Sequence, residues 1–290
     1  MYKRMRPVFF ASLALFVFFP VVRQAANTPD SDVSFEVTVD WENGTLVLEG
    51  ERSLEANYAG NSARARRRIL SERVPAFRNA VRELPVTSAE TGDDFLREDP
   101  TLLDEMDARE QSLGAPGGVR PGEALLTART RIEYPLHPTV SSVIHSHEIA
   151  RSVPRAESWV PSREYTGLVI DTRGRLPVHG ENREDHLHPV LLPRIYDTDT
   201  RVLLHPEMVE PEYLRRWGSA GFTTSSDLED SEERVGENPM VVAADGLFGT
   251  RPANPIIPRE TAERLLILEH NRTLLSEGRV LILVDPEVLE

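Results

Sequence analysis

The chain has 290 residues, 40% of them hydrophobic, and carries 47 acidic against 33 basic side chains, for a formal net charge of −14. This charge disfavours nucleic acid and anionic membrane surfaces as partners, because both repel an acidic protein. Cysteine is absent, which excludes disulfides and any anchor on a lipidated cysteine. The length suits one large domain or two modest ones.

The N-terminus has the layout of a secretory signal peptide. A basic head at residues 3–6, an uncharged apolar run at 7–22 and two alanines at 25–26 follow one another, as in exported proteins. The run is short for a membrane span, which needs about 20 residues, although an uncleaved N-terminal anchor is the alternative. We expect export to the periplasm and removal of residues 1–26, which would leave 29 basic and 47 acidic residues, a net charge of −18. Membrane contact is expected only through this segment, if it is retained.

A β-hairpin is predicted around Asn43-Gly44, in the segment "FEVTVDWENGTLVLEGE". Apolar side chains alternate on both sides of this pair, and Asn-Gly is the strongest short hairpin signal. The hairpin opens a first unit that continues with helices and a strand.

A helix is predicted over residues 63–84, where apolar side chains recur at helical spacing, and Pro75 is expected to kink or restart it. Its many arginines favour a solvated face over a phosphate site. A second helical stretch is predicted at 93–113, with its main helix beginning near Asp99-Pro100. A loop at 114–123 and a strand at 125–136 complete this unit. The predicted helix face comprises Leu70, Val74, Phe77, Val81 and Leu84.

Val153-Pro154 and Val160-Pro161 favour an extended linker. The predicted organisation is therefore a hairpin–helix–strand domain at 27–150 and a mixed-sheet α/β domain at 151–290, in the α+β class. The last strand–helix–strand is expected to place its two strands in parallel. In the second domain, strands are predicted at 167–172, 190–196, 201–204, 240–248 and 279–285, helices at 211–217 and 259–270, and an acidic loop at 225–233.

Two histidine pairs are candidate metal ligands. His145 and His147, next to Glu148, would point the same way in extended chain, and so would His186 and His188. His179 and Asp185 lie near the second pair. Neither pair has the helical His-Glu-x-x-His spacing, so surface histidines are the favoured interpretation.

Four aspartates are candidate acids or bases. Asp171 and Asp285 end predicted strands, and Asp197 and Asp199 flank the turn in "RIYDTDTRV". Paired carboxylates can act as general acid and base. However, aspartate also favours turns by bonding its own backbone, and Asp171 can pair with Arg173. The turn interpretation is therefore favoured.

No recognisable nucleophile motif occurs in the sequence. Neither Gly-x-Ser-x-Gly nor Ser-x-x-Lys is present, and both are the local signatures of serine enzymes. The segment "GLFGTRPANP" resembles a phosphate loop too loosely to count. We therefore assign no catalytic, cofactor-binding or metal-binding residue, and no cofactor.

Four segments in the last part of the chain carry a resemblance to a known module. They are "YTGLVIDTRGRLPV", "HPVLLPRIYDTDTRVLL", "NPMVVAADGLFGTRPANPIIPRETAERLL" and "EGRVLILVD", in this order across residues 165–285. They resemble a module of bacterial envelope proteins, including flagellar assembly protein T, flagellar protein P and related outer-membrane lipoproteins. The whole layout, with "LPRIYD" and "RRWG", is similar to uncharacterised exported proteins of spirochaetes. The chain departs from the lipoproteins by lacking cysteine and by its acidic insertion at 225–233.

The resemblance implies a non-catalytic structural or assembly component of the cell envelope or flagellar apparatus, with protein partners in the envelope or the flagellar basal structure. One alternative is a glycan- or peptidoglycan-binding module with Trp159 and Trp217 as stacking surfaces, although core packing is favoured for Trp217. The other is an exported metal-dependent hydrolase, for which the candidate residues are His145, His147, His186 or His188 with Asp171 or Asp197.

Overall fold

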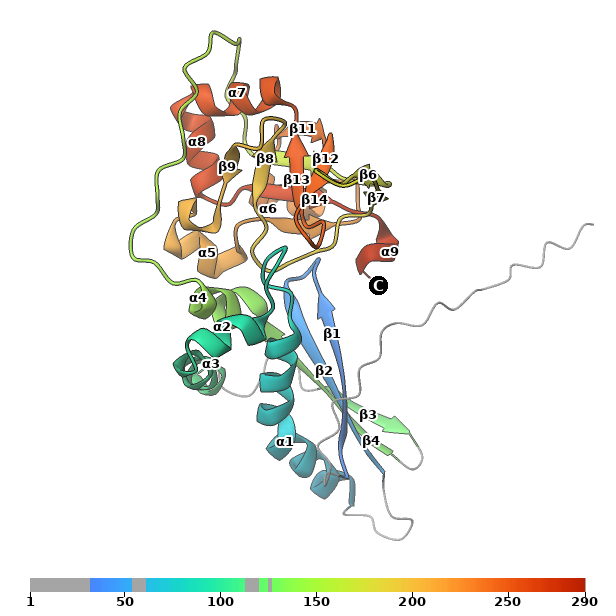
Figure 1. Ribbon diagram of the computed structural model, residues 1–290. Coiled ribbons are helices and arrows are strands. Elements are labelled where there is room, and N and C mark those ends of the chain that lie inside the picture. The colour runs from blue at the N-terminus through green and yellow to red at the C-terminus, as the bar shows by residue number, and fades with distance from the viewer. Residues whose placement is uncertain (1–31, 54–60, 113–119, 125–126, 290) are drawn as a thin grey trace, which may run out of the picture.

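Figure 1 shows a computed structural model of the chain, which describes residues 32–53, 61–112, 120–124 and 127–289. The predicted signal segment lies outside these residues. Over the described ranges, no helix is both long and apolar enough to cross a bilayer. Helices accompany antiparallel, parallel and mixed sheets, so the predicted α+β class is confirmed.

The first four strands form one antiparallel sheet in the order β1-β2-β4-β3. β1 and β2 are the predicted hairpin, with Val39 opposite Leu46 and with Gly44 at a φ of +60° in the turn. The strand predicted at 125–136 is formed as β4, whereas the end of the loop predicted at 114–123 is instead strand β3, which pairs with β4. β3 contains Pro and Gly and suggested a loop, but an edge strand tolerates both residues. The bounds are β1 Ser34–Asp40, β2 Thr45–Ser53, β3 Arg120–Ala124 and β4 Thr127–Pro135.

Helix α1 (Asn61–Glu83) packs against this sheet. Phe77 and Val81 are buried as predicted, but Ile69 rather than Leu70 is fully buried. Ile69 packs over β2 at Gly50, where a Cβ would lie 2.3 Å from its Cγ2. The helix continues through Pro75, so the predicted restart is wrong, because packing on both sides of the proline outweighs the lost backbone hydrogen bond.

The helix predicted at 93–113 is two helices, α2 (Gly92–Glu98) and α3 (Thr101–Ser112). They separate at Asp99, whose carboxylate accepts from the Thr101 amide at 3.0 Å and from its hydroxyl at 2.6 Å. Two short helical segments, η1 (His137–Ser141) and α4 (Ser142–Ile144), follow β4 although the sequence predicted no helix there. Their side chains are largely buried in the core.

The C-terminal part contains a parallel sheet in the order β10-β14-β5-β11. β5 is central, with Val169 opposite Leu281 on one side and Val241 on the other. β11 and β14 are parallel, as predicted for the last strand–helix–strand, although β5 lies between them. The bounds are β5 Leu168–Asp171, β10 Gly221–Thr223, β11 Met240–Ala243 and β14 Val280–Leu283.

A second, mixed sheet has the order β12-β13-β8-β9. The strand predicted at 240–248 is divided between the two sheets, because the Ala244 amide bonds to Asp171 of β5 and the Asp245 amide bonds to Ile256 of β13. Of the strand predicted at 190–196, only its end is formed. The bounds are β6 Leu176–Pro177, β7 Glu184–Asp185, β8 Ile195–Asp197, β9 Val202–Leu204, β12 Gly246–Phe248 and β13 Asn254–Ile257.

The helices of the C-terminal part are short. The helix predicted at 211–217 is confirmed as α5, whereas the one predicted at 259–270 breaks at Leu268, which is extended with a ψ of 135°. The bounds are η2 Pro206–Met208, α5 Pro211–Trp217, η3 Glu229–Ser231, α6 Glu232–Val235, α7 Arg259–Ile267, α8 Glu269–Ser276 and α9 Pro286–Leu289.

The two parts contact each other closely. The Leu191 and Leu192 amides each donate at 2.9 Å to the carbonyls of Pro85 and Val86, and one hydrophobic cluster runs through both parts. An extended segment at 145–166 follows the outside of the C-terminal part, as the yellow-green trace in Figure 1 shows. The domain boundary near residue 150 stays a prediction.

Candidate functional site

The carboxyl ends of the parallel strands carry polar side chains, among them the two aspartates that were predicted to end strands. Asp171 ends β5, Thr223 ends β10 and Asp285 follows β14. In open parallel sheets this edge is the usual place for ligands. The bonding of each side chain there decides between a chemical and a structural use.

Asp171 is bound by Arg173, two residues further on. The Arg173 amide and Nε donate to Asp171 Oδ1 at 3.1 and 2.9 Å, and Nη2 donates to Oδ2 at 2.6 Å. These hydrogen bonds hold the pKa of the Asp171 carboxyl below its usual range. Asp171 therefore closes the predicted turn and pairs with Arg173.

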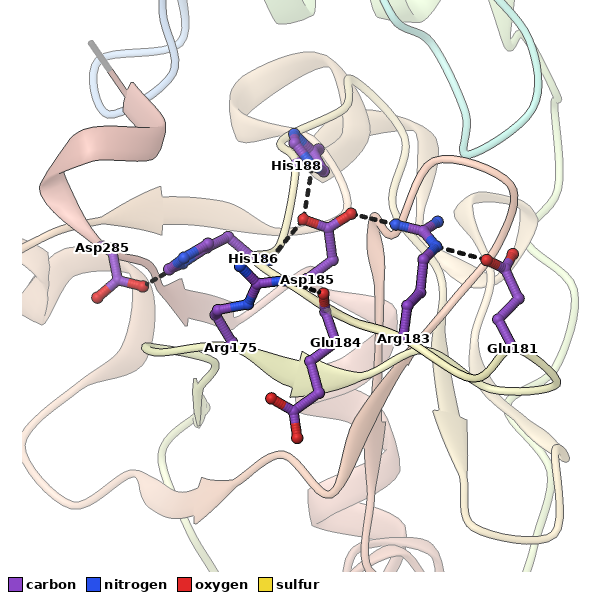
Figure 2. A network of polar contacts seen from close by, with 8 residues as sticks. All are labelled: Arg175, Glu181, Arg183, Glu184, Asp185, His186, His188 and Asp285. Carbon is purple, nitrogen blue, oxygen red and sulfur yellow. Dashed lines mark hydrogen bonds and ion pairs between the residues drawn. The ribbon is translucent and has the colours of Figure 1, made fainter.

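Asp285 is held by groups from two other segments, and Figure 2 shows one of them, His186. Its Oδ2 accepts from the Gly174 amide at 2.7 Å and lies 2.9 Å from Nδ1 of His186. His188 instead lies 3.6 Å from Asp185, which also pairs with Arg183. The two histidines of this pair thus have different partners, and Asp285 links the β5 turn to the segment carrying His186.

Asp197 lies in the other sheet, away from these residues. It is buried and accepts from the amides of Asp199 at 2.9 Å and Arg201 at 2.8 Å. Thr200 between them has a φ of +60°. The predicted turn between β8 and β9 is therefore formed, and Asp197 closes it.

His145 and His147 are adjacent, and His205, which sequence reasoning did not select, joins them. The ring centroid of His145 is 5.5 Å from that of His147 and 6.2 Å from that of His205. His147 Nε2 contacts the Val209 carbonyl at 2.7 Å, while Nε2 of His145 and Nδ1 of His147 are buried without a hydrogen bond. Burial, then repulsion from the other two rings, lowers the pKa of His145 to about 4. The His145 imidazole is therefore neutral at pH 7.

Within the described ranges, no three His, Asp or Glu side chains are arranged to hold a metal ion. His179 packs against Phe248. Trp159 is fully exposed on the extended segment, whereas Trp217 donates to the Glu277 carbonyl at 2.9 Å and stacks on Tyr213. The structure thus keeps the two histidine pairs in separate environments.

A cavity of about 550 Å³ lies where the tip of the first hairpin meets the C-terminal part. We call it the junction cavity. Trp41 at the hairpin tip contacts Phe222 edge-on at 6.0 Å, and Glu42 accepts from the Thr223 hydroxyl at 2.7 Å and from the Thr224 amide at 3.2 Å. The hairpin therefore closes one side of the cavity. The residues that line the cavity include Trp41, His137, Gly221, Phe222, Asp230 and Arg234.

Arg234, from α6, is the buried cation of this cavity. Arg234 is 9% exposed. Its guanidinium donates to the Val280 carbonyl at 3.0 Å and to the Trp217 carbonyl. No carboxylate of the described chain pairs with it, and burial alone lowers its pKa to about 9. Arg234 thus remains largely charged at pH 7 without a counterion.

Gly221 makes room for this guanidinium, and His137 lies on the same cavity. A Cβ on Gly221 would lie 2.6 Å from Arg234 Nη1. Burial, followed by repulsion from Arg234, lowers the pKa of His137 to about 3, so its imidazole is neutral. Sequence reasoning missed Arg234, because one arginine after an acidic run is usually solvated, and only the packing of α6 buries it.

The comparisons with known proteins concern the C-terminal part. Residues 167–286 match the family model of the second domain of Treponema pallidum Tp0624, which covers about two fifths of the chain. No curated protein matches the sequence. The matched segment contains the parallel sheet, the polar sheet edge and Arg234, but not the hairpin tip. The predicted likeness to spirochaete proteins is therefore confirmed for this segment: residues 167–286 are similar to the second domain of Treponema pallidum Tp0624.

Proposed function

We propose that this chain is a non-catalytic, exported binding or assembly component of the bacterial cell envelope. Its partners would be proteins of the envelope or of the flagellar basal structure. The observation that carries the proposal is the bonding of the polar sheet edge. Asp171, Asp285 and Asp197 each accept hydrogen bonds that close a turn or join two segments, as residues that maintain a fold do.

Two further features support binding rather than chemistry. The chain is strongly acidic, which would steer it toward basic partner surfaces. The junction cavity holds a fixed cation and apolar walls, which suit recognition. The flagellar association rests on the sequence resemblance of the C-terminal segments to flagellar assembly proteins.

The rival function is a metal-dependent hydrolase. It requires a metal-loaded site at His145 and His147, joined by His205, or at His186 with Asp285. Metal analysis of purified protein, incubated with zinc and then dialysed, separates the two functions. We expect no stoichiometric metal in the wild type or in His145→Ala and His186→Ala. Stoichiometric zinc that disappears in either variant would contradict the proposal.

Affinity capture from envelope extracts tests the partner directly. We expect envelope or basal-body proteins to co-purify with the chain, and to do so less at raised salt, which screens its acidic surface. A matched capture with an unrelated acidic protein of similar size is the control. Recovery of the same proteins by both baits would count against the proposal, and N-terminal sequencing of the periplasmic form checks removal of residues 1–26.

A further inference from the structure

The junction cavity combines an acidic opening with a buried cation that has no carboxylate partner within the described residues. Burying a charge without a partner costs several kcal/mol, so an arginine in this position is expected to have a compensating interaction. Two backbone carbonyls, one of them at the end of α5, and the Trp217 ring, whose centroid lies 5.3 Å from the guanidinium carbon, meet part of this need. They hold the guanidinium in place but carry no net charge, and a guanidinium has further N–H groups to donate.

The geometry around Arg234 keeps space for another group. Arg234 lines the junction cavity, and its guanidinium packs over Gly221, where a Cβ would lie 2.6 Å from Nη1. The neighbouring His137 is neutral and does not add a second cation. A planar carboxylate is the natural complement of a guanidinium, because it can accept two parallel N–H bonds.

The opening of the cavity has the opposite charge. Glu42 is bonded to Thr223 and Thr224, and Glu233 pairs with Arg216. Asp230 is exposed and makes no hydrogen bond or ion pair within the described chain. A simple anion would be repelled by these acids, whereas a ligand with a cationic group would be attracted.

We propose that the junction cavity binds a small zwitterion of the amino-acid type, with its carboxylate on Arg234 and its ammonium group toward Asp230. The volume of about 550 Å³ lies in the range of small-molecule sites and admits a free amino acid or a short peptide. Trp41, Phe222 and Leu191 offer an apolar surface for a side chain. The inference goes beyond the proposed envelope role and stands independently of it.

The test titrates the full chain carrying Trp159→Phe, so that the remaining fluorescence comes from Trp41 and Trp217 at the cavity. The probes are alanine and phenylalanine, each as the zwitterion, the amide, the N-acetyl acid and the N-acetyl amide, with Ala-Phe and Phe-Ala as dipeptides. We expect saturable binding of the zwitterions and a loss of roughly tenfold or more when the carboxylate is blocked. Tighter binding of free amino acids or of dipeptides identifies the source, and either result supports the proposal.

Two variants locate the charges. Arg234→Gln should abolish the preference for a free carboxylate, and Arg215→Gln, an exposed arginine of α5 outside the cavity, is its matched control. Asp230→Asn should weaken the binding of the zwitterions by a few fold and leave the binding of the N-acetyl acids unchanged. Because Asp230 is exposed and unbonded, this variant remains informative even if Arg234→Gln fails to fold.

Absence of saturable binding for all probes would overturn the proposal, and so would equal affinity for the zwitterion and the N-acetyl amide. These outcomes are distinct from failure of the envelope role. Probe binding without captured partners removes the envelope proposal alone, and captured partners without probe binding remove the zwitterion site alone.

Discussion

Arg173 at the sheet edge and Arg234 in the junction cavity carry the same guanidinium, but their surroundings are opposite. Arg173 is exposed and bound to Asp171 two residues away, which raises its pKa. Arg234 is buried against carbonyls, and burial lowers its pKa to about 9. The difference teaches that a charge can be neutralised within a local turn, as at Arg173, or be buried by packing without a carboxylate partner, which is the feature on which the proposed ligand site rests.

Charge reversal gives the largest expected contrast between the two regions. Arg234→Glu would place a buried carboxylate against two carbonyls and should lower the free energy of unfolding by about 4 kcal/mol or more. Arg173→Glu should cost about 1 kcal/mol, because that pair is exposed to solvent. Urea unfolding monitored by circular dichroism measures both. Similar losses in the two variants would remove the distinction.

The pH dependence of stability should separate the regions next. His137 has a folded-state pKa of about 3 against 6.5 when unfolded, so the unfolded chain binds the proton first. The stability that neutral His137 contributes to the fold is complete above pH 6.5. It declines as the pH falls, and about 2 kcal/mol of it is lost at pH 5. The Asp171 pKa is lowered from 3.8, so its contribution is present above pH 3.8 and is lost only below it. The free energy of unfolding of the wild type, His137→Asn and Asp171→Asn, measured from pH 7 to 3, checks this. A pH dependence above pH 5 that is flatter in Asp171→Asn than in the wild type would contradict it.

Steric filling at the two glycines should give a smaller contrast. Gly221→Ala places a Cβ 2.6 Å from Arg234 Nη1 and should cost about 1–3 kcal/mol by overpacking. Gly174→Ala meets no atom within 4 Å but has a φ of +83°, which should cost about 1 kcal/mol. Adding Arg234→Gln to Gly221→Ala should restore part of the stability that Gly221→Ala loses. Adding Arg173→Gln to Gly221→Ala should not restore it. Strict additivity in the first pair would show that the guanidinium does not fill this space.

The hairpin contact should give the smallest effect. Glu42→Gln weakens the bonds to Thr223 and Thr224 and should cost about 1 kcal/mol. Glu237→Gln, which removes an exposed carboxylate that makes no hydrogen bond or ion pair within the described residues, is the matched control. Equal unfolding midpoints for Glu42→Gln and the wild type would mean that the contact adds nothing to the closure of the cavity.

Local features of the fold were determined by the sequence itself. The hairpin at Asn43-Gly44 follows from alternation and turn chemistry, and the turns at Asp171 and Asp197 follow from the tendency of aspartate to bond nearby amides. Each of these signals lies within a few residues and acts on the same few residues. The Arg173 partner was predictable for the same reason.

Other features were decided only by tertiary structure. Residues 240–248 were predicted as one strand, but backbone bonds to Asp171 and Ile256 divide them between two sheets, and these partners are distant in the sequence. Arg234 resembles a solvated residue in its own segment and becomes a buried cation because Gly221, Trp217 and Val280 meet around it. The surroundings of the two histidine pairs were likewise decided by distant residues, because His205 lies next to His145 and Asp285 contacts His186. Periodicity and turn preference are properties of neighbouring residues, whereas burial and charge compensation depend on which distant segments pack together.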